Sequence, residues 1–370
     1  MKDYKVLVEH FSAVEDPRIE RSKKHLLIDI LTIGIIGTIC GAKGWEEIQI
    51  IAEAKYEWLK KFLTLPNGIP SHDTISRVFA HINVAVFEQC FTNWMQEIVS
   101  LTNGEVIAID GKCVRRSHDK TKSKSAIHMV SAWAVENGVV IGQNKVDEKS
   151  NEIVAIPKLL ETLEIAGCIV TIDAMGAQTK IAQKIIDNNA DYVLGLKGNQ
   201  GSSLKSVKEH FDTTTEIKKE TFNTVDNDHG RLETRECVVK NADILYSLDK
   251  WPGLKSVVMV RSTREIRDKK SIECRYYLSS LSPDNPEKIA KAIRSHWSVE
   301  NSLHWVLDVT FDEDRSRIRK DNAAETASIL RRISLNLVKM DKSFRGSVKR
   351  KMLKCCLSNK YLEKVFCQAN

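Results

Sequence analysis

The sequence predicts an α/β protein in which helices flank a mixed sheet. Three observations predict this fold class. Residues 1–102 show helical patterns throughout, residues 103–214 alternate short apolar strands with helices, and residues 215–284 contain four more strand patterns before helices return. Short apolar runs separated by helical segments are typical of a sheet that is buried on both faces. We therefore expect an N-terminal all-helical domain, a sheet-and-helix core, and a β-rich insertion within that core.

Length and composition agree with a globular chain of more than one unit. A chain of 370 residues exceeds one typical hydrophobic core. We expect the N-terminal domain at residues 1–102, the core at 103–214 and 285–340, the insertion at 215–284, and a basic C-terminal segment at 341–370. No signal peptide opens the chain, and the nine cysteines form no CxxC pair. These features predict a cytoplasmic protein with reduced thiols.

Positive charge is concentrated near one end of the chain. The whole chain carries +7, whereas residues 315–354 hold thirteen Lys or Arg and three Asp or Glu, a local balance of +10. A basic block of this size is typical of a protein that binds a polyanion. The alternative is a solvated basic helix face without a partner.

The N-terminal domain contains a candidate DNA-reading element. Leu26–Cys40 is predicted to be a buried helix, too short to cross a bilayer, and Trp45–Leu63 an amphipathic one. The turn Pro66–Pro70 precedes a helix at Ser71–Ile82, which begins on a good N-cap residue. Two helices around a tight turn are compatible with a helix-turn-helix. A plain helical packing subdomain is the alternative.

Two aspartates end predicted strands of the core. The apolar runs Glu105–Asp110 and Cys168–Asp173 are both followed by glycine-containing turns. Strands joined by a crossover can lie side by side and parallel, so their carboxyl ends bring Asp110 and Asp173 to one edge of the sheet. Two close carboxylates repel unless one is protonated or they share a cation. Short oxygen ligands favour Mg²⁺ or Mn²⁺ over zinc.

The remaining core elements are predicted from the same patterns. Between the two aspartates the sequence predicts a hairpin of Ala126–Val135 and Val139–Val146, joined by a type I′ turn at Glu136–Gly138. The following segments are predicted to be two helices and a fifth strand, at Asn151–Ile165, Thr179–Asn188 and Asp191–Leu196.

The stretch Arg294–Asp308 supplies a third carboxylate. Its apolar residues fall at helical spacing and predict a packed face: Val299, Leu303, Val306 and Leu307. Its polar residues fall four apart and predict a second face: His296, Glu300, His304 and Asp308. Glu300 is the candidate partner of the two aspartates. The alternative is an amphipathic helix with a few surface charges. Trp297 and Trp305 are candidates to stack on a displaced base, and the alternative for them is a place in the core, which is more common for a tryptophan on a helix.

The insertion carries strand patterns and basic side chains. The strands are predicted at Thr221–Val225, Leu232–Val239, Ser256–Arg264 and Ile272–Ser279. The basic residues among them are His229, Arg231, Arg235, Arg261 and Arg264. A sheet of this kind is expected to clamp a strand of nucleic acid, and an inert elaboration is the alternative.

Eight short motifs carry a family resemblance over the whole chain. They are Asp16-Pro-Arg18, Gly41-Ala-Lys-Gly-Trp45, Ile107-Ala-Ile-Asp-Gly-Lys112, Asp147-Glu-Lys-Ser-Asn-Glu152, Thr171-Ile-Asp-Ala-Met-Gly176, Leu196-Lys-Gly-Asn-Gln200, His229-Gly-Arg231 and His296-Trp-Ser-Val-Glu-Asn-Ser-Leu-His-Trp305. Together they resemble the DDE transposases of bacterial insertion sequences, in the branch of H-repeat-associated (Rhs-element-associated) proteins. The resemblance implies an RNase H-like core and a catalytic, metal-binding triad of Asp110, Asp173 and Glu300.

The resemblance also implies a reaction, cofactors and partners. It implies that two Mg²⁺ or Mn²⁺ ions support cleavage at the ends of the insertion sequence and strand transfer into target DNA. The implied partners are double-stranded DNA, namely terminal inverted repeats and target, and further copies of the chain in a dimer or larger assembly. The expected location is the bacterial cytoplasm, at the nucleoid when DNA is bound, with no membrane. The residues expected to contact DNA are Lys112, Lys197, Asn199, Gln200, Arg231, Arg294, His296 and His304.

The sequence departs from the family pattern around the glutamate. Many relatives place Tyr, Arg and Lys seven residues before, four before and seven after it, whereas this chain has Ile293, His296 and Leu307 there. The phosphate-binding part of that signature is therefore absent at its usual spacing. Two alternatives to an active transposase stay open. One is a catalytically inactive, DNA-binding remnant of a mobile element, and the other is an RNase H-like nuclease with another substrate.

Overall fold

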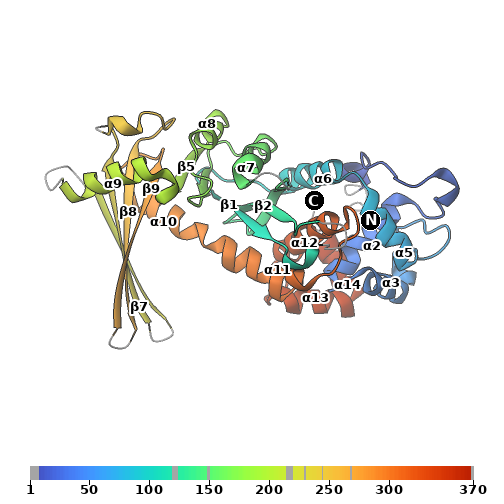
Figure 1. Cartoon of the computed structure of the whole chain (residues 1–370). Helices are drawn as coiled ribbons and strands as arrows, with labels where there is room; N and C mark the ends of the chain where they lie inside the picture. The colour runs from blue at the N-terminus through green and yellow to red at the C-terminus, as the bar shows by residue number, and fades with distance from the viewer. Residues whose placement is uncertain are drawn as a thin grey trace. The chain divides into compact units, whose positions relative to one another are not determined.

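The computed structural model in Figure 1 describes residues 8–118, 124–147, 151–213, 220–228, 231–243, 245–266 and 269–367. Within it, the chain divides into two units that are interleaved in sequence. The first consists of Met1–Ser100, Gly111–Lys149 and Glu300–Asn370, and the second of Leu101–Asp110 and Ser150–Val299. No helix among the described residues combines the length and the apolar character needed to cross a membrane.

The first unit is a helical assembly with one hairpin. Its elements are α2 (Leu27–Ile39), α3 (Trp45–Ala54), α4 (Tyr56–Leu59), α5 (His72–His81), α6 (Val84–Ile98), β2 (His128–Ala134), β3 (Val139–Lys145), α11 (Trp305–Val309), α12 (Ala323–Met340), α13 (Val348–Leu357) and α14 (Asn359–Phe366). Helix α12 lies at its centre, because it packs against α2, α5, α6 and β3 and buries all but its last two residues.

The predicted buried helix is confirmed as α2. Its glycines let neighbouring side chains approach closely, since a Cβ at Gly34 would lie 2.7 Å from the ring of Phe79. Its one charged residue, Asp29, is buried and accepts a hydrogen bond of 2.9 Å from the backbone N–H of Leu65. The acceptor role offsets part of the cost of removing this carboxyl from water.

Helix α5 begins where the sequence predicts. The Ser71 hydroxyl accepts the N-cap hydrogen bond from the backbone N–H of Thr74 at 3.4 Å. Its apolar residues Ile75, Val78 and Phe79 are fully buried, and helix α5 packs against α3 and α12. The packing role of this helix is therefore visible, and its role in reading DNA stays a prediction.

The hairpin of β2 and β3 is confirmed, but the predicted type I′ turn is wrong. The strands close on the pair Ala134 and Val139, which leaves a loop of residues 135–138. A type I′ turn needs two central residues with positive φ, and in this loop only Gly138, at +69°, has one. A register shift between Ala132 and Trp133 accompanies the longer loop.

The second unit is built on a mixed sheet. Its strands run in the order β1 (Val106–Cys113), β4 (Ile169–Ile172), β5 (Asp191–Leu196), β9 (Lys269–Ser279), β8 (Ser256–Ile266), β7 (Arg231–Asn241) and β6 (Glu220–Asp228). The pairs β1–β4 and β4–β5 are parallel, and the pairs from β5 to β6 are antiparallel. The helices of this unit are α7 (Glu152–Glu161), α8 (Thr179–Asp187), α9 (Gly201–Thr213) and α10 (Pro286–His296).

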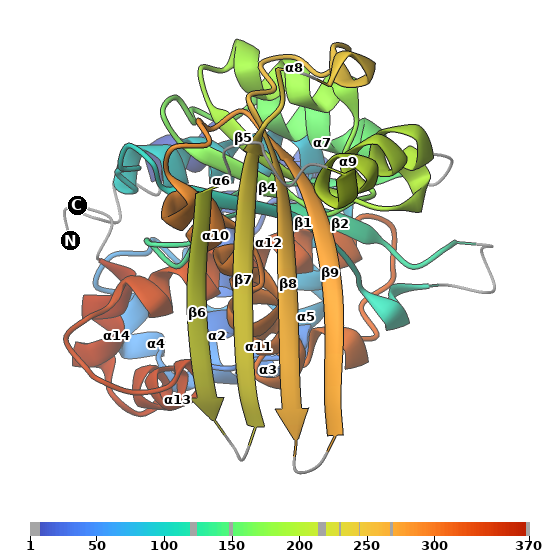
Figure 2. The same cartoon turned by 90° about the vertical axis from the view of Figure 1, so that its left-hand side faces the viewer.

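The strands of the insertion are confirmed and are longer than predicted. Figure 2 shows β6, β7, β8 and β9 side by side. Strand β9 also pairs with β5, with Leu278 opposite Leu194, so the insertion extends the sheet of the core. Helix α10 packs against β4 and β5 as well as β6 and β7. This helix, which ends four residues before Glu300, therefore spans the junction between core and insertion.

The basic block near the end of the chain is not a uniform surface. Arg331 and Arg332 are buried on α12, and both lie within ion-pair distance of the buried Glu313. Lys351 is buried as well, and its ammonium donates to the backbone carbonyl of Val338 at 3.2 Å. Part of the +10 balance counted from the sequence thus stabilises the fold and does not face a partner.

Candidate active site

The parallel pairing of β1 and β4 brings Asp110 and Asp173 together. Ile109 lies opposite Ile172 in this pairing, and each aspartate is the next residue along its chain segment. Neighbouring strands are about 4.8 Å apart, so the two carboxyl groups project from the same edge of the sheet. The side chains of both are partly exposed. The crossover argument from the sequence predicts this juxtaposition correctly.

A tight turn fixes the orientation of Asp173. Its Oδ1 accepts hydrogen bonds from the backbone N–H groups of Met175, at 2.9 Å, and Gly176, at 3.4 Å. Within the part of the chain that the structure describes, its Oδ2 accepts no hydrogen bond. One oxygen therefore holds the turn, and the other can serve a ligand.

Two side-chain amides hold this turn from the next strand. After β5, Asn199 donates to the backbone carbonyl of Ala174 at 2.5 Å, and Gln200 donates to that of Ala177 at 2.9 Å. Both residues are predicted above to contact DNA phosphate. In the structure their amide N–H groups donate to backbone carbonyls, and these hydrogen bonds fix the segment that follows Asp173.

His296 lies beside the same aspartate. Its Nδ1 is 3.1 Å from the hydroxyl of Thr171 on β4. Burial lowers the pKa of His296 below its ordinary value, although the Asp173 carboxylate opposes this shift. The imidazole is therefore mainly neutral near pH 7 and is poorly suited to the phosphate contact predicted for it. Its contact with Thr171 docks the end of α10 against β4.

The stretch from Arg294 to Asp308 is not one regular helix. Helix α10 ends at His296, residues Glu300–His304 form a π-helical turn, and α11 follows at Trp305. The π turn alters the alignment of residues spaced four apart, so the predicted polar stripe is not continuous. Single π turns within helices occur frequently at functional sites. The predicted apolar face is confirmed, since Val299, Leu303, Val306 and Leu307 are buried.

Glu300 is paired within this turn. Its carboxylate lies 3.5 Å from Nδ1 of His304, which is buried, while the Glu300 side chain is 55% exposed. Carboxylate and imidazole groups are both common as metal ligands. Trp297 and Trp305, on either side of the turn, are 43% and 58% exposed. The expectation that they are core residues is therefore wrong.

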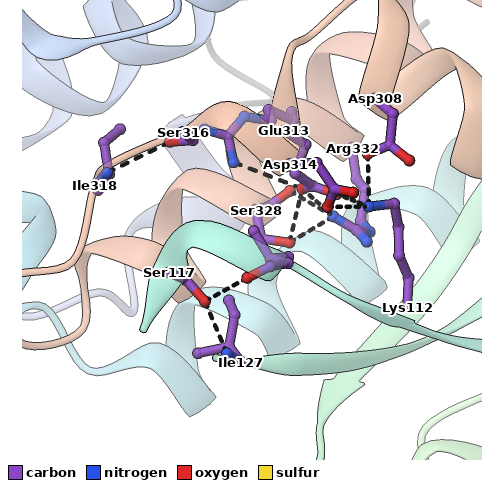
Figure 3. A network of polar contacts seen from close by, with 12 residues as sticks. Lys112, Ser117, Ile127, Asp308, Glu313, Asp314, Ser316, Ile318, Ser328 and Arg332 are labelled. Carbon is purple, nitrogen blue, oxygen red and sulfur yellow. Dashed lines mark hydrogen bonds and ion pairs between the residues drawn. The ribbon is translucent and has the colours of Figure 1, made fainter. Parts of the chain in front are cut away.

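Lys112 lies in a network of carboxylates (Figure 3). Its ammonium is 2.7 Å from Asp308, 3.1 Å from Asp314 and 3.6 Å from Glu313. The lysine side chain is only 7% exposed. An ammonium with three carboxylate neighbours is not available to a phosphate, so Lys112 joins the end of β1 to α11 and to the segment that follows it.

Glu313 is the buried centre of this network. Burial alone would raise the pKa of its carboxyl, but Arg332, Arg331 and Lys112 outweigh that effect and lower it to about 2. Arg332 Nη1 lies 3.1 Å from this carboxylate. Sequence reasoning missed Glu313, for which the signal is an acidic run, Asp312–Asp314, placed directly before the basic block.

The other predicted DNA contacts lie on or near the insertion. Lys197 is exposed after β5. Arg231 pairs with Glu233 at 3.1 Å, and Arg294 lies 3.8 Å from Asp226. His229 lies outside the described residues. Sequence reasoning also missed Glu233, although an acidic residue two positions from arginines on both sides points to a shared strand face.

The fold and the paired aspartates define a class of protein that sequence comparison confirms. The model of the transposase DDE domain matches residues 102–337, and the model of the domain associated with it matches residues 8–95. The chain belongs to the DDE transposase family.

Particular relatives place it within that family. The chain is 46% identical over 366 residues to YncI of Escherichia coli O157:H7, a protein named as a transposase. The alignment covers 97% of this chain and 94% of that relative. The chain is 43% identical over 372 residues to YhhI of E. coli K12, an H repeat-associated protein, with 98% of each covered. The resemblance to H-repeat-associated proteins is thereby confirmed. A piggyBac transposase complex with hairpin DNA aligns with 98% of this chain and 79% of its own, at a TM-score of 0.43 and 12% identity.

Proposed function

We propose that this chain is an active, metal-dependent transposase that cuts DNA at the ends of an insertion sequence and joins the freed 3′ ends to target DNA. The observation that carries the proposal is the pairing of β1 with β4, which sets Asp110 beside Asp173. Membership of the DDE family supplies the class of reaction. The succession of β1 to β3, followed by β4 and β5 in alternation with helices, supports an RNase H-like core.

Glu300 completes the proposed triad through chain connectivity. His296 contacts Thr171, two residues before Asp173, and Glu300 follows His296 by four residues. Four helical residues advance the chain by only about 6 Å, so the chain connection supports Glu300 as the third carboxylate. We propose that Asp110, Asp173 and Glu300 are the carboxylates that hold the two ions, as the family resemblance implies.

The donor set fits a hard divalent cation. Three carboxylates suit Mg²⁺ or Mn²⁺. When bound, a pair of such ions supplies an activated water and stabilises the leaving 3′ oxygen. Other residues hold the segments that carry these carboxylates. Asn199 and Gln200 fix the turn after Asp173. The contact between His296 and Thr171 fixes the end of α10.

The reaction needs no side-chain nucleophile. Water attacks the phosphodiester in the first step, and the freed 3′-OH attacks target DNA in the second. We propose double-stranded DNA as the partner, with a dimer or larger assembly on paired ends, in the cytoplasm and at the nucleoid when bound. The net charge of +7 supports a polyanionic partner.

The test uses a duplex that ends in the inverted repeat flanking the gene, a target plasmid, and Mg²⁺ or EDTA. We expect nicking at the repeat and joined products only with the metal. Binding without nicking would indicate the inactive remnant. Cleavage of any RNA–DNA hybrid, without joining, would indicate the nuclease.

A further inference from the structure

The sheet of β6–β9 has a different environment on each of its two faces. On one face, a pocket lies between the strands and α10, and alternate strand residues line it, such as Thr224, Glu233 and Ser262. Strand side chains alternate between the two faces, so the residues in between point to the opposite side. Figure 2 shows that side toward the viewer, with α9 in front of one end of the strands. There the ring of Phe211 on α9 lies 6.1 Å from that of Tyr276 on β9.

Beyond α9, three rows of side chains cross the four strands and make up what we call the outer face. The strand register aligns each row, as Asn223, Glu236, Arg261 and Cys274; Val225, Thr234, Thr263 and Ile272; and Asn227, Leu232, Glu265 and Lys270. All four side chains of the middle row are β-branched, and those of Val225 and Ile272 are 66% and 62% exposed. The solvated face of an antiparallel sheet is normally polar. An exposed apolar row therefore marks a contact surface.

The outer face carries balanced charge. Arg261 lies 3.5 Å from Glu236, and Lys270 lies 2.8 Å from Glu265. These pairs make two cations and two anions, whereas the pocket on the other face is lined by six Lys or Arg and three Asp or Glu. A neutral face gives a polyanion no electrostatic advantage. It suits a protein surface that carries charges of both signs.

The pattern of the outer face is complementary to itself. Two copies related by a twofold axis bury the same patch on both. If the axis runs along the strands, between β7 and β8, Arg261 lies opposite the partner's Glu236, and Val225 lies opposite the partner's Ile272. If the axis runs along the middle row, Arg261 lies opposite the partner's Glu265, and each residue of that row meets its own counterpart. Both arrangements place apolar groups together and Arg261 against a carboxylate.

We propose that the outer face is the surface on which a second copy of this chain docks, sheet against sheet. Packed sheets lie about 10 Å apart with their strands within about 30° of each other, and a row of β-branched side chains suits such packing. Three rows on four strands form a small interface, so we expect a reversible dimer with a dissociation constant in the micromolar range. The inference rests on the proposed function for the assembly itself, and it adds the surface that forms the assembly.

Sedimentation velocity of the full chain, from about 1 to 100 μM, tests the proposal without DNA or metal. We expect a monomer–dimer equilibrium. Ile272→Glu places a charge in the middle row and is expected to raise the dissociation constant about a hundredfold. The matched control is Ile50→Glu on α3, because Ile50 is 63% exposed against 62% for Ile272. The control should dimerise as the unchanged chain does, and circular dichroism checks the fold of each variant.

A charge exchange tests the pairing of Arg261. Arg261→Glu alone brings like charges together across the interface, so we expect the dimer to weaken about a hundredfold. Adding Glu236→Arg is expected to restore dimerisation if the axis runs along the strands, and adding Glu265→Arg if it runs along the middle row. Failure of both second substitutions to restore the dimer would overturn the proposal.

Three other results would also overturn it. They are a chain that stays monomeric throughout, a dimer on which Ile272→Glu has no more effect than Ile50→Glu, and a chain that dimerises only when DNA is added. In the last case DNA would hold the copies together. Because the measurement contains neither DNA nor metal, its outcome does not depend on nicking, and the outer face and the transposase reaction fail or succeed separately.

Discussion

At the scale of single residues, one carboxylate oxygen of Asp173 holds the turn that follows it, and the other is proposed to bind a cation. Asp173→Asn keeps an Oδ1 acceptor for the N–H groups of Met175 and Gly176, but it loses the charge that a cation requires. We expect nicking of a repeat-end duplex to fall on the order of a thousandfold, since several kcal/mol of charge stabilisation are lost. The thermal midpoint should stay close to that of the unchanged chain. Full activity of Asp173→Asn would remove this residue from the proposed site.

A substitution of Asn199 decides between two roles for this residue, which are a contact with DNA phosphate and a contact that positions the turn after Asp173. Its amide donates to the Ala174 carbonyl in the turn after Asp173. We expect Asn199→Ala to raise the Mg²⁺ concentration needed for half-maximal nicking by about tenfold and to leave DNA affinity unchanged. Gln183→Ala, which removes an exposed amide on α8, is the matched control. A loss of DNA affinity without a change in metal requirement would support the phosphate contact instead.

At the scale of elements, the Lys112–Glu313 network ties β1 to the segments after Glu300. Glu313→Gln leaves Arg331 and Arg332 buried with less negative charge, and breaking a buried pair costs about 3–5 kcal/mol. We expect a lower urea midpoint at neutral pH, followed by tryptophan fluorescence. An unchanged midpoint would show that the network contributes little to stability.

The pH dependence of stability tests the same carboxylate. The pKa of Glu313 is about 2 in the folded chain, against an ordinary value of 4.5. A lowered pKa means that the folded form holds its proton less tightly than the unfolded form, so Glu313 contributes full stability above pH 4.5. That contribution declines as the pH falls from 4.5 toward 2. Glu313→Gln should therefore lose less stability than the unchanged chain over this range, and equal losses would contradict the assignment.

Most elements could be predicted because their signals are local. The apolar run Leu26–Cys40 and the strand Asp191–Leu196 need only their own patterns, and the crossover rule added the meeting of Asp110 and Asp173. Partners far apart in sequence could not be predicted, as Lys112 and Asp314 are separated by 202 residues. The π turn at Glu300–His304 could not be predicted either, because its residue pattern does not differ from that of an α-helix.

One error could have been avoided with the sequence alone. Arg261 and Arg264 are grouped above as equivalent basic residues of the insertion. Strand side chains alternate with a period of two, so residues three apart must face opposite sides. Arg264 lines the pocket between β6–β9 and α10, and Arg261 is not among the residues that line it.

At the scale of the whole molecule, the distribution of charge differs from what the sequence indicates. Lysines and arginines are densest near the end of the chain, yet Arg331, Arg332 and Lys351 are buried there. The pocket between β6–β9 and α10 is lined by cations from segments that are spread between Arg231 and Arg294. Exposure and arrangement therefore decide where a polyanion is expected to bind, and local charge density along the sequence does not.

The central claim is that Asp110, Asp173 and Glu300 share divalent ions, and Mn²⁺ binding tests it most directly. Calorimetric titration of the full chain on a repeat-end duplex, with matched titrations of Asp110→Asn, Asp173→Asn and Glu300→Gln, measures stoichiometry and affinity together. We expect two Mn²⁺ ions per chain, and each substitution should remove one ion or weaken both by at least about tenfold. Mn²⁺ binding that is the same in all three variants as in the unchanged chain would contradict the account.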